Sequence, residues 1–297
     1  MKVATAKTAV GFRNILFATD FSDAAAKAIP YVKGIARHFG SNLVVLHARP
    51  PIGNLMTPPL AWKMEMEATQ EVDRQHRQAF LEIFAGIPTH VEIKEGEIQP
   101  CLQKAIKDHN IDLVVLGTRG RTGLGKLLLG SVAEEIFRSV ECPVLTVGPL
   151  ACASLVPGGK LREILFGGDF TPESNAAAKF AISMALEFHA TLVLLHVIPE
   201  PEAGDLVSEA EVLKSAHALL QGLVPREAQA LCRPEYFIEC GDPARTIVEF
   251  ARMRESDVIV LGARLEKGVA GAASHLPIAM AHKVVSHASC PVLTIRA

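Results

Sequence analysis

The sequence predicts two tandem α/β domains, each built on a doubly wound parallel sheet of five strands. Two observations lead to this prediction. Short runs of Val, Ile and Leu alternate along the chain with segments of helical apolar spacing, and the whole series occurs twice. Strands buried on both faces need continuous apolar runs, and strands that alternate with helices form parallel sheets through crossover connections.

Each expected element in the first half of the chain has its own signal. The strands share short runs of β-branched and apolar residues, and they are expected at 14–19, 42–48, 89–96, 112–117 and 143–148. The helices share apolar residues three or four positions apart, and they are expected at 23–40, 62–86, 98–110 and 130–140. Gly40 ends the first helix, because glycine adopts the left-handed conformation that follows a helix.

The series of segments in the first half returns in the second half. Asp20 and Asp169 lie 149 positions apart, so the period is a whole domain rather than a solenoid repeat. Four pairs of segments correspond in the same order: ILFATDFSDAAAKAI with ILFGGDFTPESNAAAKF, NLVVLHARP with TLVLLHVIP, EGEIQPCLQKAIKDHNIDLVVLGTRG with ECGDPARTIVEFARMRESDVIVLGAR, and ECPVLTVGP with SCPVLTIRA. We therefore expect one domain over 1–150 (repeat one) and another over 151–297 (repeat two), joined within the Gly- and Pro-rich segment 148–163.

Composition and charge narrow the function classes. A net charge of −2 and an aromatic content of 5% disfavour a surface that binds nucleic acid. No apolar run approaches the roughly 18 residues of a membrane span, and the N-terminal segment lacks the apolar core and cleavage site of a signal peptide. The six cysteines form no C-x-x-C pair, as expected of reduced thiols in a cytoplasmic protein. No cluster of ligands predicts a metal site.

The fourth expected strand leads into LGTRGRTGLGKLLLGSVAEEI, a segment rich in glycine and positive charge. Its spacing is Gly117-x2-Gly120-x9-Gly130-Ser131. Glycine permits close approach to backbone N–H groups, and the start of the following helix attracts anions, so the segment can cradle a polyphosphate. Positive charge nearby comes from Arg119, Arg121 and Lys126.

Two other interpretations of this segment stay open. Glycine-rich turns are common without any ligand. Gly120-x4-Gly125-Lys126 also nearly forms a P-loop, although Leu127 stands where Ser or Thr would hold Mg²⁺.

Repeat two offers an internal comparison for the cradle. Gly262 stands at the position of Gly117, but the other cradle residues are absent. Leu265, Ile278 and Ala279 stand where repeat one has Gly120, Gly130 and Ser131. The sequence therefore predicts one competent site, in repeat one, and a degenerate site in repeat two.

Both halves resemble the universal stress protein family in a tandem form. The residues that carry the resemblance are ILFATDFS, NLVVLHA, DLVVLGTRGRTGLGKLLLGSVAEEI and CPVLTVGP, with their counterparts in repeat two, so it covers nearly the whole chain. The spacing G-x2-G-x9-G-S resembles the ATP-binding signature of the nucleotide-binding branch. The resemblance implies an adenine nucleotide alpha hydrolase-like fold and these ATP-binding residues: Ala18, Thr19, Asp20, Ala48, Leu116, Gly117, Arg119, Gly120, Gly130, Ser131 and Val132.

Some residues have rival interpretations or depart from the family pattern. Asp20 could instead act as the N-cap of the helix that follows it. Arg119 stands where the family often has a polar residue or His, and Ala133 stands where Ser or Thr is common. We expect His47 and His196, which occupy the same place in both repeats, to be buried and bonded to the backbone rather than catalytic.

The favoured function is a cytoplasmic stress-response protein whose repeat one binds ATP, AMP or another adenine nucleotide, with Mg²⁺ on the phosphates, as a regulatory signal. The alternative is an enzyme, at most a slow ATP hydrolase or a nucleotidyl transferase, because no base or water-orienting group can be named. The resemblance also implies dimerisation. The apolar last strands, 143–148 and 291–296, could pair within one chain, and two chains could form a homodimer.

Overall fold

The computed structural model describes residues 10–52, 58–118, 136, 140–151, 161–199, 209–263 and 275–296. Repeat one contains β1 (Asn14–Ala18), α1 (Asp23–Ala26), α2 (Ile29–Phe39), β2 (Asn42–Arg49), α3 (Pro59–Ile83), β3 (Thr89–Glu95), α4 (Ile98–Asp108), β4 (Leu113–Gly117) and β5 (Val144–Val147). Repeat two contains β6 (Glu163–Gly168), α6 (Pro172–Phe188), β7 (Thr191–Ile198), α7 (Glu209–Leu223), α8 (Arg226–Cys232), β8 (Glu235–Cys240), α9 (Pro243–Arg254), β9 (Val258–Gly262), α10 (His275–His287) and β10 (Val292–Ile295). None of the described helices combines the length and the apolar character that a membrane span needs.

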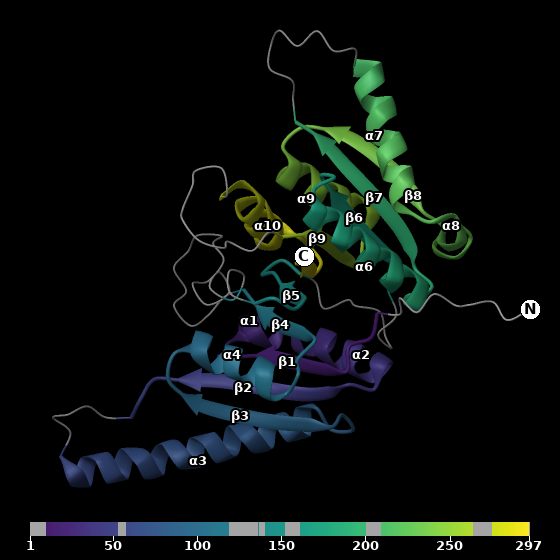
Figure 1. Ribbon diagram of the computed structural model, residues 1–297. Coiled ribbons are helices and arrows are strands. Elements are labelled where there is room, and N and C mark those ends of the chain that lie inside the picture. The colour runs from purple at the N-terminus through teal and green to yellow at the C-terminus, as the bar shows by residue number, and fades with distance from the viewer. Residues whose placement is uncertain are drawn as a thin grey trace, which may run out of the picture.

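The strands of both repeats form a single ten-stranded sheet in the order β3-β2-β1-β4-β5-β10-β9-β6-β7-β8 (Figure 1). β1 lies parallel to β2 on one side and to β4 on the other, and β6 lies in the same way between β7 and β9. β5 and β10 pair in antiparallel direction at the centre. The predicted fold class is confirmed, with the last strand of each repeat at the interface between them.

Equivalent residues of the two repeats meet at the centre of the molecule. Leu145 of β5 lies opposite Leu293 of β10, which is the corresponding leucine of the other repeat. Phe39 and Phe188 also correspond, and their ring centroids are 5.7 Å apart. Contacts between like positions are the mark of an isologous interface. The two repeats are therefore related by an approximate two-fold axis.

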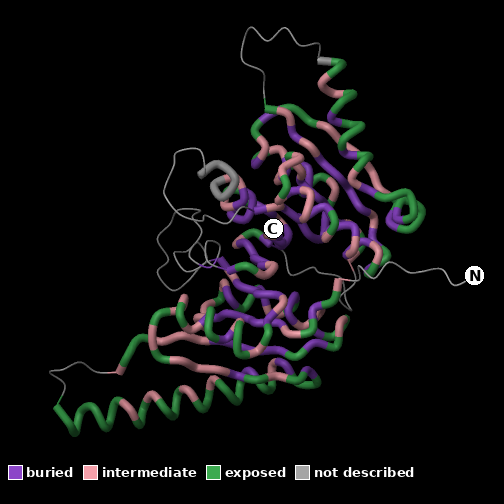
Figure 2. Tube along the Cα trace, in the orientation of Figure 1, coloured by how far each residue is buried: buried purple, intermediate pink, exposed green. Residues whose placement is uncertain are grey.

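The hydrophobic core forms two layers, one on each face of the sheet. Successive side chains of a strand point to opposite faces, so Ile15 and Phe17 belong to the layer that α2, α3 and α6 cover. Leu16 and Ala18 belong to the layer that α4, α9 and α10 cover. The strands at the centre are almost fully buried (Figure 2). Each layer contains residues of both repeats, so the two repeats share their core.

The first predicted helix is interrupted in the structure. The sequence predicts one helix over 23–40, but α1 ends at Ala26 and a turn separates it from α2. Pro30 explains the break, because it has no N–H to donate to the carbonyl of Ala26 and its ring crowds that carbonyl. Gly40 ends α2 with a φ of 64°, as predicted. The helix predicted over 130–140 falls largely outside the described residues.

Candidate functional site

The carboxyl ends of β1, β2 and β4 meet at one edge of repeat one, where the strand order reverses. Ala18 pairs with Leu46 of β2 on one side and with Leu116 of β4 on the other. Ligands of open α/β sheets bind at this kind of edge. The predicted site residues that are described lie at or just beyond these strand ends: Ala18, Thr19, Asp20, Ala48, Leu116 and Gly117. The others lie outside the described residues: Arg119, Gly120, Gly130, Ser131 and Val132.

A hydrogen-bonded turn after β1 positions the carboxylate of Asp20. Phe21 has a φ of 61°, and its N–H donates to Oγ1 of Thr19 at 3.1 Å. The N–H of Ser22 donates to Oδ1 of Asp20 at 3.0 Å. Ser22 is itself the N-cap of α1, because its Oγ accepts from the N–H of Ala25 at 3.2 Å. The capping interpretation of Asp20 is therefore wrong, and the hydrogen bond described for its carboxylate uses Oδ1 only.

His47 is partly buried and bonded to the backbone, as predicted. Its Nδ1 lies 2.8 Å from the carbonyl oxygen of Thr19, and the ring of Phe21 packs against it with centroids 4.3 Å apart. Burial lowers the pKa of His47 below its ordinary value, and this effect outweighs the opposing hydrogen bond to Thr19. His196 makes the same contact with Gly168, at 2.7 Å. The repeated histidine thus ties the second strand of each repeat to the end of the first.

The fold itself requires a glycine at position 117, which was not predicted from the sequence. A Cβ atom at this position would lie 2.5 Å from the carbonyl oxygen of Ala24 in α1. In repeat two, a Cβ atom on Gly262 would lie 2.6 Å from backbone atoms of Glu173 and Ser174 in α6. Glycine at the end of β4 and β9 therefore lets the first helix of each repeat pack against the sheet. Gly120, Gly130 and Ser131 are then the residues of the motif whose spacing indicates a phosphate ligand.

Thr118 places a buried polar group beside the strand ends, and the sequence analysis missed it. Thr118 is 3% exposed, and its Oγ1 has no hydrogen-bond partner within the described part of the chain. A buried hydroxyl without a partner costs free energy. Repeat two has Ala263 at the corresponding position. The sequence did offer a signal for Thr118 as a site residue, because this threonine directly follows an apolar strand and precedes the glycine segment.

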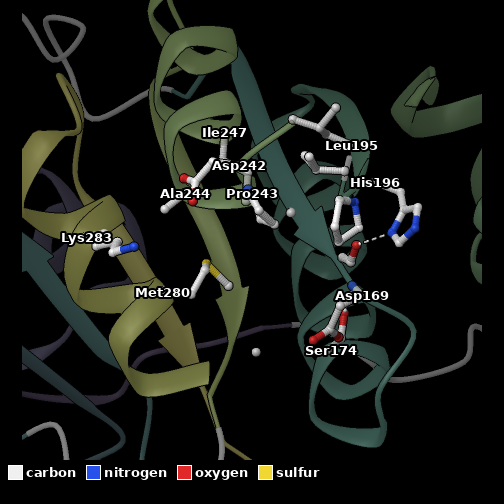
Figure 3. Close-up of a pocket in the computed structure, with 15 residues that line it drawn as sticks. Asp169, Ser174, Leu195, His196, Asp242, Pro243, Ala244, Ile247, Met280 and Lys283 are labelled. Carbon is white, nitrogen blue, oxygen red and sulfur yellow. Dashed lines mark hydrogen bonds between the residues drawn. The ribbon is translucent and has the colours of Figure 1, made fainter. Parts of the chain in front are cut away.

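The corresponding edge of repeat two contains a cavity of about 470 Å³ (Figure 3). This size is typical of small-molecule sites, which occupy roughly 300–1,000 Å³. Asp169 and His196 lie on one side of the cavity, and Met280 and Lys283 of α10 lie on the other. Oδ1 of Asp169 accepts hydrogen bonds from the N–H and the hydroxyl of Thr171. Repeat two therefore has a cavity of small-molecule size at this edge, although its sequence lacks the glycine pattern.

Comparison with known proteins agrees with the duplicated architecture. Residues 11–148 and residues 160–296 each match the universal stress protein family. A universal stress protein of Mycolicibacterium smegmatis is 27% identical over 220 residues, which are 71% of this chain and 70% of the relative. The universal stress protein in the QAH/OAS sulfhydrylase 3′ region of Thermus aquaticus is 31% identical over 140 residues, which are 46% of this chain and 98% of the relative.

A solved structure shares the fold over almost the full length. The crystal structure of a universal stress protein from Archaeoglobus fulgidus matches with a TM-score of 0.66 and 20% identity, and the match covers 95% of this chain and 98% of that one. Both halves of the chain thus have the sequence of one family, and the whole has the fold of a solved member. The chain belongs to the universal stress protein family, as a tandem of two of its domains.

Proposed function

We propose that this protein is a stress-response module that binds ATP in repeat one and uses the bound nucleotide to regulate its interactions. The position of the glycine motif carries the proposal. Gly117, the first residue of G-x2-G-x9-G-S, ends β4, and β4 pairs with β1, the strand that precedes Asp20. This edge is where the strand order reverses, and it is the usual ligand position of such sheets.

The strand ends supply groups that suit an adenine nucleotide. Ala18 and Leu116 are buried apolar neighbours that could lie against a base. Oδ2 of Asp20 could accept hydrogen bonds from ribose hydroxyls, and the hydroxyl of Thr118 would gain a partner in a ligand oxygen. The phosphates, with Mg²⁺, would lie against the N–H groups and side chains of the glycine segment, which includes Arg119, Gly120, Gly130, Ser131 and Val132.

Exchange of cradle residues between the repeats tests this proposal. Titration calorimetry of the full chain with ATP should give one site per chain. The double variant Gly130→Ile/Ser131→Ala, which copies Ile278 and Ala279 of repeat two, should abolish ATP binding. It would cover the amides at the start of the helix that the sequence predicts over 130–140, and it removes a hydroxyl. Leu265→Gly in repeat two is the matched control and should leave the stoichiometry at one. Two equivalent sites per chain, or unaltered affinity in the double variant, would contradict the proposal.

A second matched pair tests the ribose contact. Asp20→Asn keeps an acceptor for the N–H of Ser22 but loses the charge, so ATP and AMP should both bind roughly 10- to 100-fold more weakly, as expected for a hydrogen bond to a charged group. Asp169→Asn makes the same change in repeat two and should leave ATP affinity unchanged. Equal losses in the two variants would place nucleotide in both repeats.

The enzyme alternative predicts turnover rather than binding alone. Slow hydrolysis or nucleotidyl transfer would consume ATP in a sample of the purified chain, and Gly120→Val should then remove both binding and turnover. His47 is a titratable ring at the strand ends of repeat one, and its Nδ1 donates to the carbonyl of Thr19. This contact fixes the tautomer and orientation of the ring, so Nε2 is the atom that a general-base role would need.

A further inference from the structure

Three side chains with metal-binding atoms gather between β3 and the end of α4. His90 and Glu92 are two positions apart in β3, so their side chains lie on the same face of the strand. His109 directly follows α4. Nε2 of His109 lies 2.9 Å from Oε1 of Glu92, and Nε2 of His90 lies 3.4 Å from the same oxygen. The potential ligand atoms of all three residues lie within 4.8 Å of one another.

Two imidazole nitrogens and a carboxylate oxygen form a ligand set that suits divalent transition metals. Zn²⁺ binds such atoms at about 2.0–2.2 Å, so the ligands of a tetrahedral ion lie roughly 3.3–3.5 Å apart. The distances of 2.9 and 3.4 Å from Oε1 of Glu92 are close to this value. An ion could bind the cluster once side-chain movements bring the three ligand atoms, which lie within 4.8 Å of one another, to the tetrahedral spacing.

The surroundings of the cluster favour a charged carboxylate and access for an ion. The side chain of Glu92 is 12% exposed and that of His109 is 29% exposed, whereas His90 is open to solvent. Nζ of Lys94 lies 3.6 Å from Oε2 of Glu92. The other oxygen, Oε1, is the one that lies near the two histidines. Burial alone would raise the pKa of Glu92, but the hydrogen bond to His109 and the charge of Lys94 outweigh burial, and the pKa is lowered.

Repeat two has different side chains at the positions that correspond to the cluster of His90, Glu92 and His109. By strand register and the repeat spacing, the residues that correspond to His90, Glu92 and His109 are Glu235, Phe237 and Arg254. Nη2 of Arg254 lies 2.9 Å from Oε2 of Glu235, and its guanidinium lies 5.5 Å from the centre of the Phe237 ring. Both repeats thus link the helix end to the edge strand. Repeat two uses a permanent cation, whereas repeat one uses imidazoles, which can exchange a proton for a metal.

We propose that His90, Glu92 and His109 form a binding site for a divalent transition-metal ion of the Zn²⁺ class. Nε2 of each histidine and Oε1 of Glu92 are the protein ligands, and water completes the coordination. His109 precedes β4, so the site lies toward the amino ends of the strands, away from the candidate nucleotide site at their carboxyl ends. A bound ion would fix the end of α4 to β3, the edge strand of the sheet.

Cobalt spectroscopy of the metal-free full chain, prepared without a histidine tag, tests the proposal. One Co²⁺ per chain should give visible d–d bands without a thiolate-to-metal band, because no cysteine is among the ligands. Zn²⁺ should displace the Co²⁺ at a ratio of one to one and raise the midpoint of thermal unfolding. A thiolate band, or no saturable Co²⁺ binding, would overturn the proposal.

Single substitutions test whether these three residues are the metal ligands. Glu92→Gln and His109→Gln should each weaken Zn²⁺ affinity by more than the roughly 10- to 100-fold that loss of an outer-shell group costs. His90→Asn changes an exposed side chain and should weaken binding while the fold is kept, so it remains informative if a more buried variant unfolds. His217→Gln, at an exposed histidine of α7, is the matched control and should leave affinity unchanged. Wild-type affinity in both His90→Asn and Glu92→Gln would refute the assignment.

Discussion

Repeat one and repeat two begin with the same turn and diverge at the strand ends that follow. Phe21 and Phe170 have φ values of 61° and 63°, and a histidine from the second strand bonds to the backbone before each turn. Gly117 and Gly262 both leave room for a helix backbone. Features that both repeats keep are therefore explained by the fold. Function is better sought where the repeats differ, in the glycine segment after β4 and in the cluster beside β3.

The largest expected effect concerns the glycine that the repeats share. Gly117→Ala and Gly262→Ala should each lower the free energy of unfolding by about 1–3 kcal/mol, because the new methyl group meets helix backbone that cannot move easily. Urea denaturation of the full chain measures this change. Gly222→Ala in α7 is the control, because nothing lies within 4 Å of its Cβ position, and it should stabilise the chain slightly. If Gly117→Ala is as stable as the wild type, the fold does not need this glycine, and a ligand is the better explanation for it.

A smaller effect, of opposite sign in the two repeats, is expected at the central strands. Thr294 donates its hydroxyl to the carbonyl oxygen of Val144 at 3.2 Å, whereas the buried hydroxyl of Thr146 has no partner within the described chain. Thr294→Val should therefore cost about 1 kcal/mol, and Thr146→Val should be neutral or stabilising. The denaturant midpoints of the two variants, each compared with that of the wild type, measure this difference. Equal destabilisation of the two variants would show that Thr146 and Thr294 contribute equally, contrary to this prediction.

The smallest effect concerns pH. The lowered pKa of His47 means that the native state resists protonation. Below the unfolded value of about 6.5 the unfolded chain binds this proton more readily, so the contribution of His47 is full above that pH and is lost as pH falls through the native pKa. His47→Gln should therefore lose less stability than the wild type between pH 7 and pH 5. Parallel pH profiles of the two proteins would exclude this contribution.

Elements that one local pattern determines could be predicted from the sequence. Short continuous apolar runs such as those of β1 and β4 are typical of strands buried on both faces, and Gly40 ends a helix through its own backbone conformation. Features that depend on contacts between distant segments could not be found in this way. The partner of Gly117 is a helix far from it in sequence, and His109 meets His90 only because α4 returns to the edge strand. Pro30 did offer a local signal for the break between α1 and α2.

The approximate two-fold axis has a consequence for how the two halves can vary. In a dimer of identical chains, a residue beside the axis faces its own copy, so a histidine there would meet a histidine and a glutamate would meet a glutamate. In this chain, Nε2 of His38 lies 3.1 Å from Oε1 of Glu187, which occupies the same position in the other repeat. Covalent fusion of the halves thus permits unlike partners at the centre. An isolated copy of either repeat would lose this complementarity when it paired with itself.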